Sequence, residues 1–304
     1  MSTLKANPLR VTWLFCILYL WTAPAAFAAP DAAEIKERKE IDANVHRLWS
    51  SKDFVAIDAL AQNYRSKTAL TTSGYWKLSF FYEAFDKLTN LISVSDFPSG
   101  YEWKMLEEWR SEYPRSPTAI IVNAQFLIRQ AERIAFEQMR SNIYDKSPDL
   151  PVDLLQAARD LLVKNAEATS HDPHWHTTMM RIRRLEKEPI DELLSAYTET
   201  LDASPDYTQT HFEMFGYLFN LWYPDMRRIE AIANTIAGKT QHQNGSAVYA
   251  RLYESAYSRI HQKQPFSLKG INWNKFRGGY ERIIADFPSA WNTNHFAYFS
   301  CIAR

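Results

Sequence analysis

Residues 193–223 read LLSAYTETLDASPDYTQTHFEMFGYLFNLWY, and the two apolar runs in this stretch meet at Pro205. Each run has the apolar spacing of an amphipathic helix. Proline lacks the N–H that a helix interior must donate, so a helix normally ends before it, whereas proline is tolerated in a first helical turn. Pro205 therefore marks the boundary between two predicted helices.

The composition of the whole chain also favours helices over strands. The sequence has only 8 glycines among 304 residues, whereas average usage would give roughly 21. Aromatic residues make up 14% of the chain, with 10 Trp, 16 Tyr and 17 Phe, and each can bury a large apolar area. Alternating runs of Val, Ile and Thr are few, so the predicted fold class is all-α.

Similar boundaries recur along the chain. Ser116 and Pro117 fit the cap and the first position of another predicted helix. Four prolines end or separate helical segments at corresponding places: Pro114, Pro173, Pro205 and Pro288. Eight residues before them lie Leu106, Asn165, Tyr197 and Tyr280.

This pattern resembles the second helix of a tetratricopeptide (TPR) repeat, in which an aromatic residue packs ahead of a terminal proline. The resemblance implies antiparallel helix pairs stacked as a TPR-like right-handed α-solenoid, with its motifs between residues 99 and 304. Two features depart from the family. The prolines do not keep the 34-residue TPR period, and the small residue expected about ten positions after each proline is present only as Ala124. Arg183, Phe215 and Tyr298 stand at the other three places. A non-repeating helical domain whose prolines simply end helices remains the alternative.

The segment 75–92 is predicted to form an unusually aromatic helix with Ser73 as its cap. It contains Tyr75, Trp76, Phe80 and Phe81. Large aromatic residues are mostly packing residues, so this segment is predicted to lie in the central core. An exposed aromatic binding face is the competing interpretation.

Residues 1–28 have the layout of a secretory signal peptide. Lys5 and Arg10 precede an apolar run, and the sequence Ala-Phe-Ala that ends at Ala28 has the small-x-small pattern of a cleavage site. We expect cleavage near Ala28, a TPR-like domain over 29–304, and a secreted or periplasmic protein with no stable membrane span after cleavage. An uncleaved anchor is the alternative.

The charge balance argues against nucleic-acid binding, and the cysteine content argues against disulfides. The chain has 35 basic and 35 acidic residues, which gives no electrostatic footprint for nucleic acid. Cleavage of the leader would remove Cys16 and leave Cys301 alone, so no disulfide within the mature chain is predicted.

The chain has no clear catalytic or cofactor motif. No Gly-x-Ser-x-Gly turn and no glycine-rich phosphate loop occur. His171, His174 and His176 form the densest set of metal ligands, but their spacing across Pro173 does not place three imidazoles on one helix face. A solvated loop is the favoured interpretation, and no catalytic residue, cofactor or metal site is predicted.

The TPR resemblance implies a concave surface lined by the first helix of each pair. Its register after Pro205 assigns Gln209, Phe212, Phe219 and Asn220 to that surface, and its register after Pro114 assigns Thr118, Ile121, Gln125 and Arg129. If a partner binds there, alanine at Phe212 and Gln125 is expected to weaken binding without lowering thermal stability.

The predicted function is that of an exported TPR-like interaction module of the bacterial cell envelope. It would bind a protein or peptide and have no enzymatic activity. One alternative is an exported hydrolase with a cleft between helical layers, which a convergent acid pair beside an apolar pocket would favour. A third expectation is self-association through the apolar residues 291–304, where no polar capping helix follows.

Overall fold

The structure is a computed structural model that describes residues 32–89, 97–141, 150–240, 245–260 and 270–303. The predicted signal peptide, residues 1–28, lies outside these ranges. Within them the chain is all-α, as predicted, with one isolated β-bridge between Leu70 and Trp76. The helices are α2 (Ala32–Ser50), α3 (Phe54–Tyr64), α4 (Lys77–Thr89), α5 (Tyr101–Glu112), α6 (Pro117–Ser141), α7 (Val152–Lys164), α8 (Ala166–Thr169), α9 (Pro173–Leu185), α10 (Ile190–Ala203), α11 (Thr208–Trp222), α12 (Met226–Lys239), α13 (Gly245–Ile260), α14 (Trp273–Asp286) and α15 (Ala290–Ile302).

The helix boundaries predicted at Pro205 and at Ser116 are confirmed. α10 ends at Ala203 and α11 begins at Thr208, on either side of Pro205. The Ser116 hydroxyl accepts a hydrogen bond from the backbone N–H of Ala119 at 3.0 Å, as an N-cap of α6 should. No helix of the described ranges is both long and apolar enough to cross a membrane.

The helix predicted over 75–92 is shorter than expected. α4 begins only at Lys77, and residues 90–92 lie outside the described chain. Ser73 does not cap it: its hydroxyl lies 3.1 Å from the Ser289 hydroxyl, and its backbone N–H donates to the buried Glu34 carboxylate at 2.9 Å. The turn before α4 contains Gly74 with a φ of 85°, a left-handed conformation that only glycine adopts without cost. Contacts of Ser73 with residues far away in the chain therefore take the place of the predicted N-cap.

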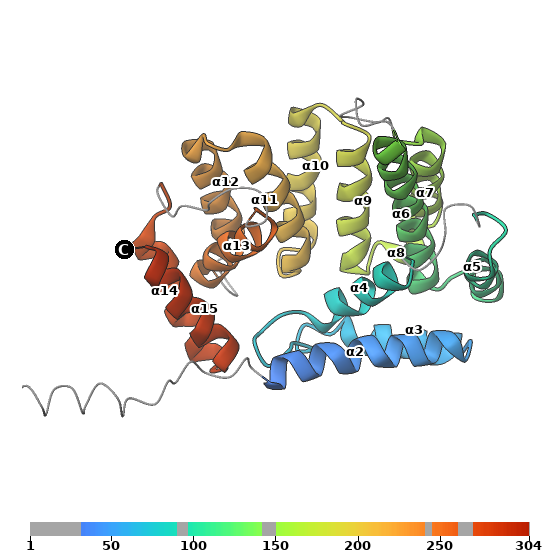
Figure 1. Cartoon of the computed structure of the whole chain (residues 1–304), viewed down its shortest axis with the longest axis horizontal. Helices are drawn as coiled ribbons and strands as arrows, with labels where there is room; N and C mark the ends of the chain where they lie inside the picture. Colours follow the sequence, from blue (N-terminus) through green and yellow to red (C-terminus); the bar gives the residue numbers. More distant parts are fainter. Residues whose placement is uncertain (1–31, 90–96, 142–149, 241–244, 261–269, 304) are drawn as a thin grey trace, which may run out of the picture.

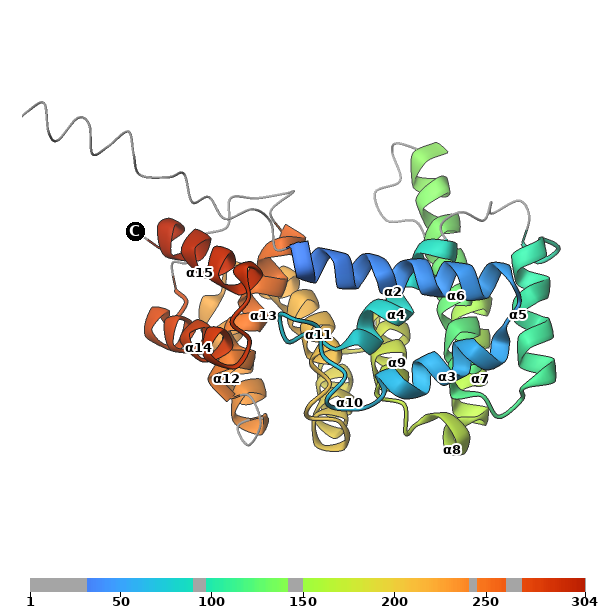
Figure 2. The same cartoon turned by 90° about the horizontal axis from the view of Figure 1, so that it is seen from below.

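The helices enclose two hydrophobic cores. The first contains Trp109, Phe81 and Phe85 and is built from α2 to α9, and the second contains Tyr253 and Tyr280 and is built from α9 to α15. Figure 1 shows α6, α7 and α9 to α12 standing side by side, with α14 and α15 at one end of the row. α2 and α3 run crosswise beneath this row, and Figure 2 shows them from below.

The segment between α3 and α4 connects helices α2 and α3 to the row of helices above them. The Trp76 indole N–H donates to the Asp206 carbonyl oxygen at 3.0 Å, and Lys67 forms an ion pair with the Asp206 carboxylate. The Arg251 Nη2 donates to the Ser73 carbonyl oxygen at 2.6 Å. Residues more than one hundred positions apart in the chain thus hold the layers together.

Helices α13 and α14 cross at close range at Gly279. A Cβ added to Gly279 would lie 2.2 Å from the Ser246 carbonyl oxygen and 2.8 Å from the Ala250 Cβ. The TPR pattern places its small residue elsewhere, at positions occupied here by Phe215 and Tyr298. In this chain the close approach is instead permitted by a glycine in the helix that precedes Pro288.

Candidate binding groove

Two adjoining cavities lie along one side of the helices. The polar cavity has a volume of about 260 Å³ and the aromatic cavity about 490 Å³. They share Ser79, Glu83 and Gln209, so we treat them together as the groove. The other residues of the polar cavity are Asp86, Gln125, Arg129, His174, Thr177, Thr178, Arg181 and Glu213. Those of the aromatic cavity are Arg38, Tyr75, Phe80, Phe212, Glu254, Ser255, Tyr257, Trp291, His295, Tyr298 and Phe299.

An ion network forms one wall of the polar cavity. Asp86 Oδ2 accepts from Arg129 Nη2 at 2.5 Å and from Arg181 Nη1 at 3.2 Å. Glu132 Oε2 accepts from the same two arginines at 3.0 and 2.7 Å. Burial acts to lower the pKa of Arg181, but the Asp86 and Glu132 carboxylates outweigh it and raise that pKa above its ordinary value. The network therefore carries fixed charges of both signs.

Three buried polar atoms of residues that line this cavity have no hydrogen-bond partner in the described chain. They are Asp86 Oδ1, Gln125 Oε1 and Arg129 Nε. Most buried polar atoms in proteins are hydrogen-bonded, and leaving one unpaired costs about 1–3 kcal/mol. These three residues lie around one cavity, so packing within the described chain does not satisfy every polar group there.

His174 is a neutral, fully bonded residue on the floor of the polar cavity. Its ring nitrogens contact Gln125 Nε2 at 3.1 Å and Tyr207 Oη at 2.9 Å. The ring stacks on Tyr82 with a centroid distance of 4.1 Å. Burial lowers the pKa of His174 to about 4. It positions neighbouring groups and carries no charge near neutral pH.

The depressed pKa of His174 predicts a pH-dependent stability. Below an ordinary histidine pKa of 6.5 the unfolded chain binds a proton that the folded chain, with a pKa of about 4, does not. The free energy of unfolding should therefore fall as the pH drops from 6.5 towards 4, by up to about 1.4 kcal/mol per pH unit for this group. Urea unfolding of His174→Gln between pH 7 and pH 4.5 should show a correspondingly shallower slope. His171→Gln, at an exposed position, should keep the wild-type slope, and the same slope in both variants would contradict the assignment.

The aromatic cavity holds an arginine among three rings. The Arg38 guanidinium carbon lies 4.3 Å from the Phe80 ring centroid, 4.5 Å from that of Trp291 and 5.1 Å from that of Tyr75. Its Nε and Nη2 both lie 2.6 Å from Oε1 of the buried Glu34. Cation–π contacts and the ion pair together fix the position of this guanidinium.

A second charged network, centred on Glu254, lies beside the aromatic rings of this cavity. Glu254 Oε1 accepts from Tyr75 Oη at 2.7 Å and from His295 Nδ1 at 2.5 Å, and Oε2 accepts from Arg251 Nη1 at 2.8 Å. Burial acts to raise the pKa of Glu254, but Arg251, His295 and Tyr75 hold it well below its ordinary value. Glu254 is therefore an ionised acceptor with both oxygens occupied.

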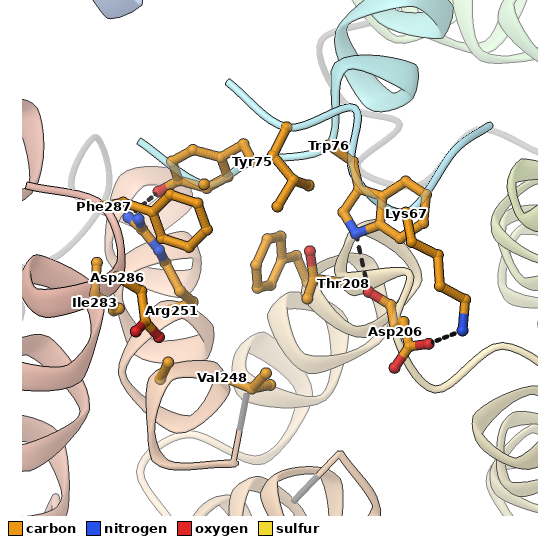
Figure 3. A pocket seen from close by; sticks show the side chains of 14 residues that line it. Lys67, Tyr75, Trp76, Asp206, Thr208, Val248, Arg251, Ile283, Asp286 and Phe287 are labelled. Atoms are coloured by element: carbon orange, nitrogen blue, oxygen red, sulfur yellow. Dashed lines mark hydrogen bonds and ion pairs between the residues drawn. The ribbon is translucent and has the colours of Figure 1, made fainter. Parts of the chain in front are cut away.

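A third, smaller cavity adjoins the aromatic one and shares Tyr75 and Phe212 with it. Figure 3 shows it between Tyr75 and Arg251 on one side and Asp206 with Lys67 on the other. Its volume is about 70 Å³, far below the roughly 300–1,000 Å³ of ordinary ligand pockets. We assign it to packing around the segment before α4.

The structure brings together four of the eight residues predicted to face a partner. Gln125 and Arg129 line the polar cavity, Phe212 lines the aromatic one and Gln209 lines both. The others do not line the groove: Thr118, Ile121 and Phe219 are buried, and Asn220 is exposed outside it.

The expected effect of alanine at Phe212 and Gln125 needs correction. Phe212 is only 6% exposed and Gln125 only 4% exposed. Truncation of a buried phenylalanine costs about 3–5 kcal/mol through lost packing, and loss of Gln125 would remove a partner of His174. Both changes would lower stability, so neither is a clean probe of binding.

Several residues of the groove were not predicted from the sequence. Arg38, Glu254 and His295 come from three helices that are far apart in the chain. The only local signals are the spacings Arg251 to Glu254 and Trp291 to His295, which place each pair on one helix face. Neither spacing indicates that the two faces meet.

The three histidines near Pro173 do not converge. His174 is buried with both ring nitrogens bonded, whereas His171 is exposed. Among the described residues no group of three or more His, Cys, Asp and Glu side chains could hold a metal ion. Cys301 is a free, exposed thiol.

Comparison with protein-family models, with curated proteins and with solved structures gives no match to this chain. The function of the groove is therefore inferred from its own residues.

Proposed function

We propose that this chain is an exported TPR-like helical-repeat protein that binds a protein or peptide segment in the groove. The observation that carries the proposal is the adjacency of the two cavities, which share three lining residues and draw side chains from α2, α4, α6, α9, α11, α13 and α15. Stacked helices of a right-handed α-solenoid of antiparallel pairs would produce such an extended surface. The leader at 1–28 supports export to the cell envelope.

The chemistry of the groove suits a peptide segment. Its polar end offers hydrogen-bond donors and acceptors close together, with Arg129, Gln125 and Gln209 among them. Its other end offers aromatic walls such as Phe80 and Tyr298. A peptide presents amide N–H and C=O groups along its backbone and apolar side chains at intervals, so both ends of the groove would be used at once.

We expect exposed groove residues to contribute to binding without contributing much to stability. Tyr298 is 43% exposed and Gln209 is partly exposed, and both line the groove. In a screen of bead-bound random octapeptides, the wild-type protein should retain a defined set of sequences. Tyr298→Ala and Gln209→Ala should each weaken binding of those peptides about tenfold, since truncating an interface anchor costs on the order of 1–2 kcal/mol.

The matched control is Tyr101→Ala, which removes a tyrosine that is 60% exposed on α5, outside the groove. It should bind like the wild type. All three variants should unfold within about 2 °C of the wild-type midpoint because they remove little buried area. No retained peptides, or equal losses in Tyr101→Ala and Tyr298→Ala, would refute the groove as the binding site.

One observation favours the hydrolase alternative. His295 is oriented by the Glu254 carboxylate and lines the aromatic cavity, as a general base does in hydrolytic enzymes. The acid pair that such an enzyme would use is not formed, because the ionised Glu254 is saturated with donors. Release of p-nitrophenol from p-nitrophenyl butyrate at equal rates by the wild type and His295→Gln would remove this candidate.

Self-association through residues 291–304 remains a further proposal for the same end of the molecule. Helix α15 exposes Tyr298, Cys301 and Ile302. Sedimentation of the wild-type protein as a monomer at micromolar concentration would remove it.

A further inference from the structure

The Arg38 guanidinium has an open edge. Nε and Nη2 share one oxygen of Glu34, and Nη1 has no protein partner among the described residues. A guanidinium carries five N–H donors in a planar fork. Nη1 and the second N–H of Nη2 therefore form an end-on pair of parallel donors, which is the geometry that binds a carboxylate through two hydrogen bonds.

This fork is held in place before any ligand binds. The guanidinium lies between the Phe80 and Trp291 rings, and Glu34 fixes its other edge. Glu34 is itself buried and accepts hydrogen bonds from Thr71 and from the Ser73 backbone. A ligand would not have to immobilise a flexible arginine, so little of its binding energy is lost to ordering the site.

His295 provides a second nitrogen in the same cavity. Its Nδ1 is occupied by Glu254, whereas Nε2 has no partner within the described ranges. The His295 ring centroid lies 4.7 Å from that of Trp291, the same ring that contacts Arg38. In its protonated form the imidazole can donate from Nε2 while Nδ1 stays on Glu254.

The carboxylates of the cavity do not favour a cationic ligand. Both oxygens of Glu254 are taken by Tyr75, His295 and Arg251. Glu83 forms an ion pair with Lys87. Among the described residues of the cavity, an ammonium group would thus meet the open N–H groups of Arg38, which is unfavourable, and the one carboxylate with an open oxygen is the half-exposed Glu83.

Aromatic rings form much of the remaining wall, together with polar side chains such as Ser79 and Gln209. Phe212, Tyr298 and Phe299 complete a cavity of about 490 Å³, which is within the size range of sites for small organic molecules. Aromatic walls favour a flat or aromatic body through offset or edge-to-face contacts.

We propose that the aromatic cavity is a binding site for a small aromatic carboxylic acid, with the carboxylate on the Arg38 fork beside His295 and the ring between the aromatic walls. This site is the aromatic end of the groove, so the acid would compete with a peptide there, but its binding can be measured whether or not a peptide binds.

The test uses 2-naphthoate and 2-naphthamide, which have the same ring system and differ in charge. Isothermal titration of the wild-type protein should give a dissociation constant at least about tenfold lower for 2-naphthoate, because only the acid forms charge-assisted hydrogen bonds. Arg38→Lys keeps a positive charge beside Glu34 but loses the planar fork, and should abolish this preference. His295→Gln should weaken 2-naphthoate binding by a smaller factor.

The matched control is Arg277→Lys, an exposed arginine of α14 outside the cavity, which should bind like the wild type. Equal affinity of the wild type for the two ligands, absence of binding heat with 2-naphthoate, or an unchanged preference in Arg38→Lys would each overturn the proposal. If Arg38→Lys does not fold, the wild-type comparison of the two ligands and His295→Gln still decide the question.

Discussion

Replacing Arg251 by methionine should lower the free energy of unfolding by about 3–5 kcal/mol, because it leaves a buried carboxylate without its partner. Arg251 donates to Glu254, to the Ser73 carbonyl oxygen and to Asn292 Oδ1, at 2.6–2.8 Å. Its side chain is only 8% exposed. One residue of α13 therefore bonds the turn before α4 and helix α15, two parts of the chain that are far apart in sequence.

The matched control is Arg282→Met, which breaks an ion pair with Asp286 on the surface of α14, where the arginine side chain is 61% exposed. It should cost no more than about 1 kcal/mol. The double variant R251M/E254M should recover part of the loss, since no uncompensated carboxylate remains. Urea unfolding measures all three, and a loss in Arg251→Met no larger than in Arg282→Met would contradict the role assigned to this network.

Replacing Gly279 by alanine should also destabilise the fold, by about 1–3 kcal/mol or more, through overpacking. The added methyl group would lie 2.2 Å from the Ser246 carbonyl oxygen, a backbone atom that cannot move without displacing α13. The neighbouring Gly278 provides the control, because a methyl group there meets nothing within 4 Å. Gly278→Ala should stabilise the protein by about 0.5–1 kcal/mol, since alanine is the better helix former.

The two adjacent substitutions should change the free energy of unfolding in opposite directions. This is a strict test, because both replace glycine by alanine in the same helix. Thermal and urea unfolding of the two variants are sufficient. A loss of stability in both variants would indicate that α14 tolerates no side chain at either position, and the close crossing of α13 and α14 would then not be the cause.

The candidate site was only partly predictable. The spacing after Pro205 led to Gln209 and Phe212, and the spacing after Pro114 led to Gln125 and Arg129. Helical periodicity places the two residues of each pair on one face of their own helix. Thr118 followed from the same periodicity but is buried, and its hydroxyl accepts a hydrogen bond from Arg65, the residue after α3. Helical periodicity shows which residues share a face of one helix, but it does not show which other helix covers that face.

The sequence by itself determined the fold class and most helix ends. Few glycines, helical apolar spacing and prolines such as Pro205 act through bonds within a few residues, so they can be interpreted locally. Tertiary structure alone decided that Ser73 bonds Glu34 rather than capping a helix, and that Arg38, Glu254 and His295 meet in one cavity. These contacts join residues far apart in the chain, and their energies depend on burial and on the distance between charges, which exist only once the helices have packed.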